Sequence, residues 1–248
     1  MSHVIYWLDI DGDRTGLEVT VNGFPAERFL RSHGGRLPIN EFVLPGANRI
    51  EVRRSLWIST KEDSEGGEIS FKLVLAEFRN ILKMGEKVVA EATAAFFAAA
   101  PRTILLAGAF AGDPAPAPPP LHAFEPIGPG RQRQILDALD TVAGYWRSGD
   151  GDGIMRWMKP YLDDYVRAYP LESASRMEER VRRMVAAFSS EKVEFDRNQT
   201  LLDPVPGSNL VDCLGPRGAA VRIARAGAPD YDMWAVVGIR GGEVVLVR

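Results

Sequence analysis

Three closely spaced aspartates are the first residues of the sequence whose types could do chemistry. Asp9, Asp11 and Asp13 alternate along the chain, which is how the calcium loop of a helix-loop-helix motif begins. That loop also needs glycine at its sixth position and a bidentate glutamate at its twelfth, where this chain has Arg14 and Thr20. We therefore interpret the aspartates as part of a polar turn between two strands.

The histidines and the cysteine offer no metal site and no obvious base. His3, His33 and His122 show no paired ligand spacing, and no histidine follows residue 122. The side chain that most often serves as a general base is thus missing from the second half. Cys213 lies in an apolar run, which favours a core position. The chain also lacks a Gly-x-Ser-x-Gly, a Walker and a dinucleotide-binding glycine pattern. We predict neither a metal nor a cofactor.

A band of aromatic residues in the second half could line a ligand pocket. Trp146, Trp157, Tyr161 and Tyr165 fall in two segments with helical periodicity. Such aromatic residues bury a large area and keep a polar group available for a ligand. The other interpretations of the same band are a packed core and a protein interface.

Isomerase or dehydratase chemistry would add a carboxylate base and a donor for the developing oxyanion to that pocket. Asp164, Asp196 and Asp212 are candidate bases, and the two tyrosines and Trp234 are candidate donors. Spacing alone assigns none of them to a catalytic position, so no catalytic residue is predicted. The candidate pocket residues are Trp146, Trp157, Tyr161, Tyr165, Asp196, Asp212 and Trp234.

Composition limits the classes of partner. The chain has 248 residues, a net charge of −3 and a pI near 5.7, and so lacks the basic character of a nucleic-acid-binding surface. Its hydrophobic and charged fractions are those of a globular protein. It has no run of about 18 apolar residues, so we expect no membrane span. The first residues do not read as a secretory signal, and we expect a cytoplasmic location.

The first half, residues 1–111, reads as an all-β domain. Alternation of apolar and polar residues predicts strands over 4–10, 17–21, 69–75 and 103–110. Residues 88–99 are ambiguous, because their alanines favour helix whereas their place between strands favours strand. We interpret them as a strand.

A turn signal in this half carries a resemblance. Pro45–Gly46 fits the centre of a type II turn, and Asn48 can bond local backbone. The following Ile50 and Val52 alternate with charged residues. This Pro-Gly-x-Asn-x-Ile-x-Val pattern resembles the turn and strand of many immunoglobulin-like and jelly-roll accessory domains. The resemblance implies a β-sandwich.

Prolines mark the predicted boundary. Residues 112–130 contain seven of the 17 prolines, including three in succession at 118–120. Consecutive prolines prefer the polyproline II conformation and cannot join a helix or a central strand. We predict a semi-rigid linker over 112–130, followed by a second domain over 131–248.

Helices and then strands are predicted in the second domain. Apolar residues from Ile135 to Trp146 define one amphipathic helix. A second follows the glycine-aspartate run at 149–153, and we expect Pro160 to break, kink or restart it. Ser175 and Glu178 form the capping box of a third. Five strands then form an antiparallel meander, closed by a tight turn at 241–242.

This order resembles the nuclear transport factor 2-like fold, also called the SnoaL-like or ketosteroid-isomerase-like fold. The best local support lies in Leu139–Tyr165, where a helix ends in Trp146–Asp150 and the next begins at once with Ile154. The resemblance implies an α+β cone, in which a curved antiparallel sheet wraps around the helices and leaves a cavity at the open end. It also implies a homodimer formed through the sheet.

Three functions follow from these observations. The first is a non-catalytic binding or protein-interaction protein, with a small apolar ligand or a protein partner in the second domain. The second is a cofactor-free isomerase or dehydratase that acts on a small apolar molecule. The third is a bacterial secretion-associated or partner-neutralising protein, suggested by an acidic, cofactor-free chain of two domains.

Overall fold

The computed structural model describes residues 2–12, 16–29, 34–55, 67–79, 82–96, 103–112, 123–169, 172–188, 192–225 and 230–247. The chain divides into two compact units. Unit 1 is Met1–Pro118 with Arg167–Leu171, and unit 2 is Pro119–Val166 with Glu172–Arg248.

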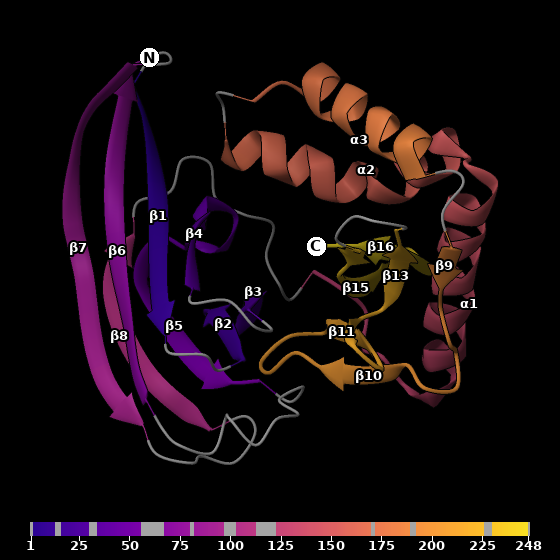
Figure 1. Cartoon of the computed structure of the whole chain (residues 1–248), viewed down its shortest axis with the longest axis horizontal. Helices are drawn as coiled ribbons and strands as arrows, with labels where there is room; N and C mark the ends of the chain where they lie inside the picture. Colours follow the sequence, from indigo (N-terminus) through magenta and orange to yellow (C-terminus); the bar gives the residue numbers. More distant parts are fainter. Residues whose placement is uncertain are drawn as a thin grey trace. The chain divides into compact units, whose positions relative to one another are not determined.

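Unit 1 consists of two four-stranded antiparallel sheets, drawn from indigo to magenta in Figure 1. The β1 sheet has the strand order β4-β1-β6-β7, and the β2 sheet has the order β3-β2-β5-β8. The β-rich first half predicted from the sequence is thus confirmed. Its strands are β1 (Ser2–Gly12), β2 (Leu17–Val21), β3 (Phe24–Phe29), β4 (Gly34–Pro38), β5 (Gly46–Arg54), β6 (Gly67–Arg79), β7 (Leu82–Phe96) and β8 (Ile104–Gly112).

The two sheets of unit 1 share one core. The ring of Tyr6 on β1 lies 5.7 Å from that of Phe110 on β8. A Cβ at Gly108 would come within 2.3 Å of the Phe71 ring, so only glycine lets β8 approach β6 there. Ile50 and Val52, predicted to alternate inward, are fully buried.

The predicted turn before β5 has the expected geometry. Gly46 has a φ of +85°, the conformation that a type II turn requires at its third position. The Asn48 side chain accepts a hydrogen bond from the Leu44 N–H at 2.7 Å and donates to the Leu44 and Gly46 carbonyls. Local backbone bonding by this asparagine is therefore confirmed.

The ambiguous segment 88–99 is a strand as far as the structure describes it. β7 runs from Leu82 to Phe96, and residues 97–100 lie outside the described part of the chain. Gly85 lies inside this strand and does not end it. The alanines of β7 face β6, where Ala90, Ala92 and Ala94 oppose the larger Leu73, Phe71 and Ile69. Pairing with β6 has overridden the helical propensity of alanine.

Unit 2 contains three helices and two antiparallel sheets among its described residues (Figure 1). The helices are α1 (Pro129–Ser148), α2 (Gly151–Ala168) and α3 (Ala174–Phe188). The strands are β9 (Lys192–Glu194), β10 (Leu201–Pro204), β11 (Val211–Gly215), β12 (Gly218–Ala219), β13 (Val221–Ala224), β14 (Tyr231–Met233), β15 (Ala235–Arg240) and β16 (Glu243–Leu246).

Three details of the helices differ from the sequence-based expectation. Pro160 lies inside α2, which is one helix, so the expected break or restart at this residue does not occur. α3 begins at Ala174, and its cap lies two residues before the predicted Ser175, because the Ser173 hydroxyl accepts the Arg176 N–H at 3.3 Å and its carbonyl accepts the Met177 N–H. α2 begins at Gly151, inside the glycine-aspartate run and not after it, and the Asp150 carboxylate caps it by accepting the Gly153 N–H at 2.8 Å.

The strands of unit 2 are antiparallel but do not form a meander. The β15 sheet has the order β10-β11-β15-β16, with β12 beside β11, and the β13 sheet has the order β14-β13-β9. β12 leads into β13 past Ala220, and β14 leads into β15 past Trp234. The chain therefore passes from one sheet to the other three times, once between β9 and β10 and twice at the neighbouring Ala220 and Trp234. Local alternation cannot reveal these passages.

Each sheet of unit 2 packs its apolar residues against the helices. The helix cluster joins α1, α2 and α3 to the β13 sheet, and the sheet cluster joins α1 to the β15 sheet. Trp157, Met158, Tyr161 and Phe195 pack against both clusters. The helix cluster has Val142, Ala143, Trp146, Ile154, Met155, Leu162, Met177, Val181, Val185, Phe188, Val221, Ile223 and Met233, and the sheet cluster has Ile135, Leu139, Val211, Cys213, Ala220, Ala235, Val237 and Leu246.

Candidate functional site

The segment before α1 fixes the β15–β16 hairpin of unit 2. The Phe124 side chain is buried, and its carbonyl accepts the Asn209 side-chain N–H at 2.7 Å. Glu125 donates its N–H to the Ile239 carbonyl at 2.8 Å. The structure describes residues 123–130 of the segment predicted as a linker. These residues therefore belong to unit 2 and pack against its hairpin.

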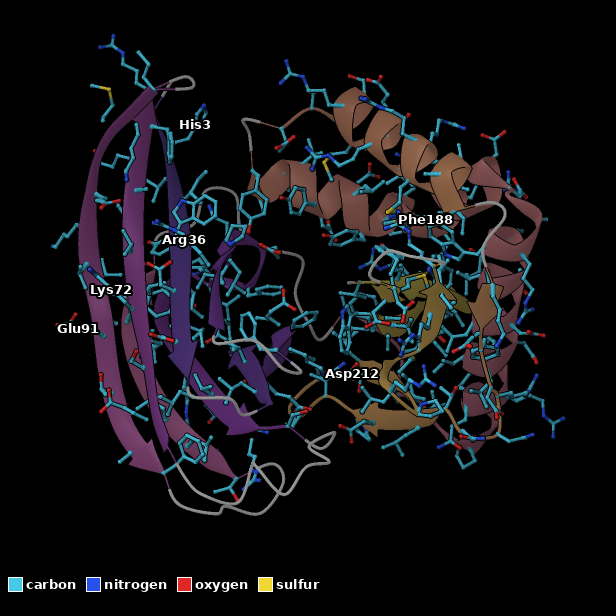
Figure 2. The ribbon with its side chains drawn as sticks, in the orientation of Figure 1. His3, Arg36, Lys72, Glu91, Phe188 and Asp212 are labelled. Carbon is cyan, nitrogen blue, oxygen red and sulfur yellow. The ribbon has the colours of Figure 1, made fainter. Side chains whose placement is uncertain are left out.

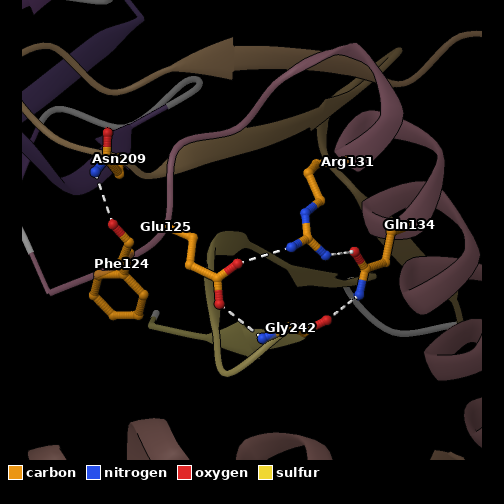
Figure 3. Close-up of polar contacts among 6 residues, drawn as sticks. All are labelled: Phe124, Glu125, Arg131, Gln134, Asn209 and Gly242. Carbon is orange, nitrogen blue, oxygen red and sulfur yellow. Dashed lines mark hydrogen bonds and ion pairs between the residues drawn. The ribbon is translucent and has the colours of Figure 1, made fainter.

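A closed ring of polar contacts continues from this segment to the hairpin turn (Figure 3). The Glu125 carboxylate accepts the Gly242 N–H at 2.7 Å and Arg131 Nη2 at 2.8 Å. Arg131 Nη1 donates to Gln134 Oε1 at 2.9 Å, and Gln134 Nε2 donates to the Gly242 carbonyl. We call Glu125, Arg131, Gln134 and Gly242 the hairpin clamp. It ties the turn of the hairpin to the first turns of α1.

The candidate site is a groove beside this clamp, with a volume of about 390 Å³. Three elements line it: one flank of α1, the first turns of α2, and β16. Its volume lies within the range typical of small-molecule sites, and its lining mixes apolar surface with a few polar groups. The lining residues are Gln134, Ala138, Thr141, Val142, Tyr145, Gly153, Arg156, Trp157, Glu243 and Val244.

The α1 wall of the groove follows from helical spacing. Gln134, Ala138, Thr141 and Tyr145 recur every three or four residues, so they form one stripe. This stripe lies beside the buried one that begins with Ile135. The wall is about 16 Å long, at 1.5 Å of rise per residue. Its floor stays open because Ala138 is small and the Thr141 hydroxyl turns back to the Asp137 carbonyl at 2.9 Å.

The α2 end of the groove is aromatic and basic. A Cβ at Gly153 would lie 2.5 Å from the Tyr145 ring, so glycine allows α2 to approach α1 this closely. Arg156 lies over the Tyr145 ring at 6.0 Å and is 4.0 Å from the Asp150 carboxylate. The indole Nε1 of Trp157 is buried and makes no hydrogen bond within the described residues. This end offers a cation at Arg156 beside aromatic surface.

Only one of the seven candidate pocket residues, Trp157, lines the groove. Trp146 is a core residue: it is 1% exposed, and its indole N–H points to the Met233 sulfur at 3.4 Å. Its ring also contacts those of Phe188 and Tyr231. Burial raises the pKa of the Tyr231 phenol, as expected in this apolar surrounding.

The two candidate tyrosines and Asp196 lie outside the groove. The rings of Tyr161 and Tyr165 are 5.9 Å apart and pack, half-buried, against the helix cluster. Asp196 follows β9 and shapes a turn, because its carboxylate accepts the Asn198 N–H at 2.9 Å and its carbonyl accepts the Thr200 hydroxyl. None of the three is among the lining residues.

Asp212 and Trp234 belong to the strands. Asp212 is buried on β11, opposite Val236, and Figure 2 labels it there together with Phe188 at the end of α3. Its neighbours Val211 and Cys213 point to the sheet cluster, so Asp212 points to the opposite face. Trp234 lies at the point where β14 passes into β15. Of the seven candidates, the groove thus takes in Trp157 alone.

A carboxyl with a shifted pKa lies elsewhere in unit 2. Glu194, Arg222 and Asp232 face one another across the β13 sheet, and Arg222 also pairs with Asp230. Burial raises the pKa of Asp232, while Arg222 and Arg217 oppose this shift. A raised pKa can mark a catalytic acid or base. Asp232 does not line the groove, however, so the row is interpreted as support for the sheet.

Sequence reasoning missed most of the groove. No expectation from the sequence fell on Gln134, Ala138, Thr141, Tyr145 or Arg156. The usable signal was the run of small and uncharged residues on the α1 flank, where a solvated helix face would normally be charged. The sequence correctly predicted a strand at Glu243 and Val244. That this strand ends a sheet depends on which strands pair, and local sequence does not show this.

Comparisons of the chain with models of known families, with curated proteins and with solved structures found no match. The function is therefore argued from the groove itself. Within the described residues, no helix combines the length and the apolar character needed to cross a bilayer. The same residues contain no cluster of three or more histidine, cysteine, aspartate or glutamate side chains arranged to hold a metal ion.

Proposed function

We propose that the chain is a binding protein that holds its ligand in the groove of unit 2 without catalysing a reaction. The observation that carries the proposal is the groove between α1, α2 and β16. It joins an apolar surface of Ala138, Val142 and Trp157 to a cation at Arg156. Ligand sites typically combine such a surface with a few polar groups that orient the ligand.

The composition of the groove favours binding over isomerase or dehydratase chemistry. That chemistry would need a carboxylate base and an oxyanion donor in the same cavity. The predicted candidates Asp196 and Asp212 lie on a turn and on the far face of a sheet, apart from Trp157. Glu243 is the only carboxylate among the lining residues, and it sits at the clamped end, away from Arg156.

We further propose that unit 2 has the cone layout of nuclear transport factor 2-like proteins. Three helices followed by antiparallel strands support this assignment, as do the two passages from sheet to sheet at Ala220 and Trp234. The proposed ligand site differs from the cavity that the resemblance implies, because the groove lies along the edge strand β16.

Fluorescence titration with anilinonaphthalene sulfonate tests the proposed function. This probe combines apolar rings with one anionic group, and so matches Trp157 and Arg156. We expect saturable binding to the full chain. Ala138→Trp fills the groove and should lower the affinity at least tenfold, which corresponds to about 1.4 kcal/mol.

The matched control is Ala187→Trp, the same substitution at an exposed position of α3. It should bind the probe as the unchanged chain does, and both variants should show the same helical circular dichroism. If the probe fails to bind, or if the Ala138 and Ala187 variants bind it equally, the groove is not a ligand site and the proposal is wrong.

A further inference from the structure

The outer edge of β16 presents backbone groups that the chain leaves unused. Gly241 and Gly242 have φ values of +60° and +81° and form a two-residue turn, so the flanking Arg240 and Glu243 are a hydrogen-bonded pair. Such pairs alternate along an antiparallel ladder. The N–H and C=O groups of Val244 and Leu246 therefore point away from β15.

Two observations agree with this assignment. Val247, three residues past Val244, donates its N–H to the Val236 carbonyl at 2.8 Å, as the alternation requires. Within the described part of the chain, no hydrogen bond uses the outward backbone groups of Val244 or Leu246. These groups form a short row in the spacing of a β-strand: Val244 lines the groove, whereas Leu246 lies further along the same edge and is 3% exposed.

The groove borders the start of this row, at Glu243 and Val244. Adjacent residues of a strand point to opposite faces of the sheet, yet Glu243 and Val244 both line the groove. A cavity that both residues reach lies beside the edge of the strand and not over one face. The opposite wall is the α1 stripe, whose length of about 16 Å matches about five residues of extended chain at 3.3 Å each.

The hairpin clamp holds this edge in place. Glu125 and Gln134 bond both the N–H and the C=O of Gly242, as Figure 3 shows. Arg240 also lies over the Phe124 ring at 4.6 Å. An edge that is already ordered loses little conformational entropy when a partner strand pairs with it.

We infer that the ligand of the groove is an extended polypeptide segment of another protein, which pairs with the outer edge of β16 between α1 and α2. The inference rests on the proposed function and names its ligand class. A groove of 390 Å³ takes a few residues of a single strand and has no room for a folded domain. Strand addition to a sheet edge is a general mode of peptide recognition.

The lining defines the side chains of this segment. Every second side chain faces the groove, where it meets Ala138, Val142 and Trp157, and these positions should be apolar. The residue at the α2 end meets Arg156 and should be acidic. Free backbone groups supply affinity, and the alternating pockets supply selectivity.

Panning a displayed library of random nonapeptides on the full chain supplies the probe. The best enriched peptide is then synthesised with a methyl group on one backbone nitrogen at a time. We expect affinity losses of about tenfold at every second residue, because only those N–H groups reach β16. Methylation at the residues between them should change the affinity less than twofold.

Val244→Pro makes the same test from the protein side. It removes an N–H that points outward, a position where edge strands accept proline. The variant should lose the peptide while keeping its fold by circular dichroism. The methyl scan uses the unchanged chain and decides the question even if the proline variant fails to fold.

The outcomes separate the two proposals. If no peptide is enriched, or if methylation shows no alternation, strand addition is wrong, while a groove that binds anilinonaphthalene sulfonate in an Ala138-dependent way remains a ligand site. If the chain alone dimerises and Val244→Pro abolishes the dimer in sedimentation, the occupant is a second copy and the inference is overturned.

Discussion

Among the strands that end a sheet, β7 of unit 1 and β16 of unit 2 differ instructively. In unit 1, β7 is long and pairs only with β6 in its sheet. It exposes apolar side chains, with Leu82 67% and Met84 61% exposed. In unit 2, β16 has four residues, and its apolar side chains are at least half-buried. By exposed apolar surface alone, β7 would be the docking site.

The backbone of β7 argues against docking. Its register with β6 shifts twice, leaving Met84 and Val89 as extra residues. Such bulges interrupt the row of backbone groups that an added strand would need. Lys83 and Lys87 also lie on this strand, and lysines on an edge discourage pairing. β7 therefore carries the features that protect an edge.

β16 has the opposite character. Its register with β15 is uninterrupted, it carries no lysine, and a groove runs beside it. An available edge is thus marked by a regular row of backbone groups next to a cavity. Exposed side chains alone are a poor guide. Three predictions test this contrast. Each compares a variant with a control variant on β7 or on an exposed helix face.

Gly238→Ala should have the largest effect. Its new Cβ would lie 2.4 Å from the Phe124 ring and 2.7 Å from Leu210, so the segment before α1 must move. Overpacking of this kind costs about 1–3 kcal/mol of unfolding free energy. Urea unfolding monitored by circular dichroism measures it.

The counterpart is Gly85→Ala on β7, where a Cβ would meet nothing within 4 Å. We expect no loss of stability there. Equal stability of the two variants would mean that the segment before α1 does not hold the β15–β16 hairpin.

Glu125→Ala should have an intermediate effect. It removes the acceptor of the Gly242 N–H and of Arg131, at a cost of about 1 kcal/mol for a half-exposed group. Hydrogen exchange at the Gly242 amide should become several-fold faster. Glu86→Ala, which removes a lysine-paired carboxylate from β7, should leave that amide unchanged. If the Gly242 amide exchanges at an unchanged rate in the Glu125 variant, the hairpin clamp does not hold this turn.

Replacing both Lys83 and Lys87 of β7 by valine should have the smallest effect on stability, within about 0.5 kcal/mol. It should nevertheless increase concentration-dependent association in sedimentation velocity, because the edge loses its charges. The control replaces the exposed helical residues Lys159 and Arg183 by valine. If both double variants associate equally, lysine does not protect β7.

Local signals in the sequence predicted much of the secondary structure. Gly46, Gly241 and Gly242 adopt the positive φ values that their turns require. The α1 stripe of Ile135, Leu139, Val142 and Trp146 is buried as its spacing indicated. Such predictions succeed because turn geometry and helical periodicity depend on residues within a few positions of one another.

Other features needed distant parts of the chain. The cap of α3 is Ser173 and not the predicted Ser175. β10 had no recognisable pattern in the sequence, because only one short pairing with β11 defines it. The end of α2 is another case: Tyr169 belongs to unit 1, where its hydroxyl accepts the Asn40 N–H at 3.0 Å. Asn40 is far from Tyr169 in the sequence, so no local stretch of residues around Tyr169 could have predicted this hydrogen bond.

The sequence by itself determined a β-rich first half, three amphipathic helices, most of the strand segments that follow them, and the absence of histidine from the second half. The tertiary structure decided which strands end their sheets and which helix flank faces a cavity. Strand order is set by pairing between residues far apart in the chain, such as Cys213 with Ala235. A groove is space left between packed elements, so no residue of the sequence encodes it alone.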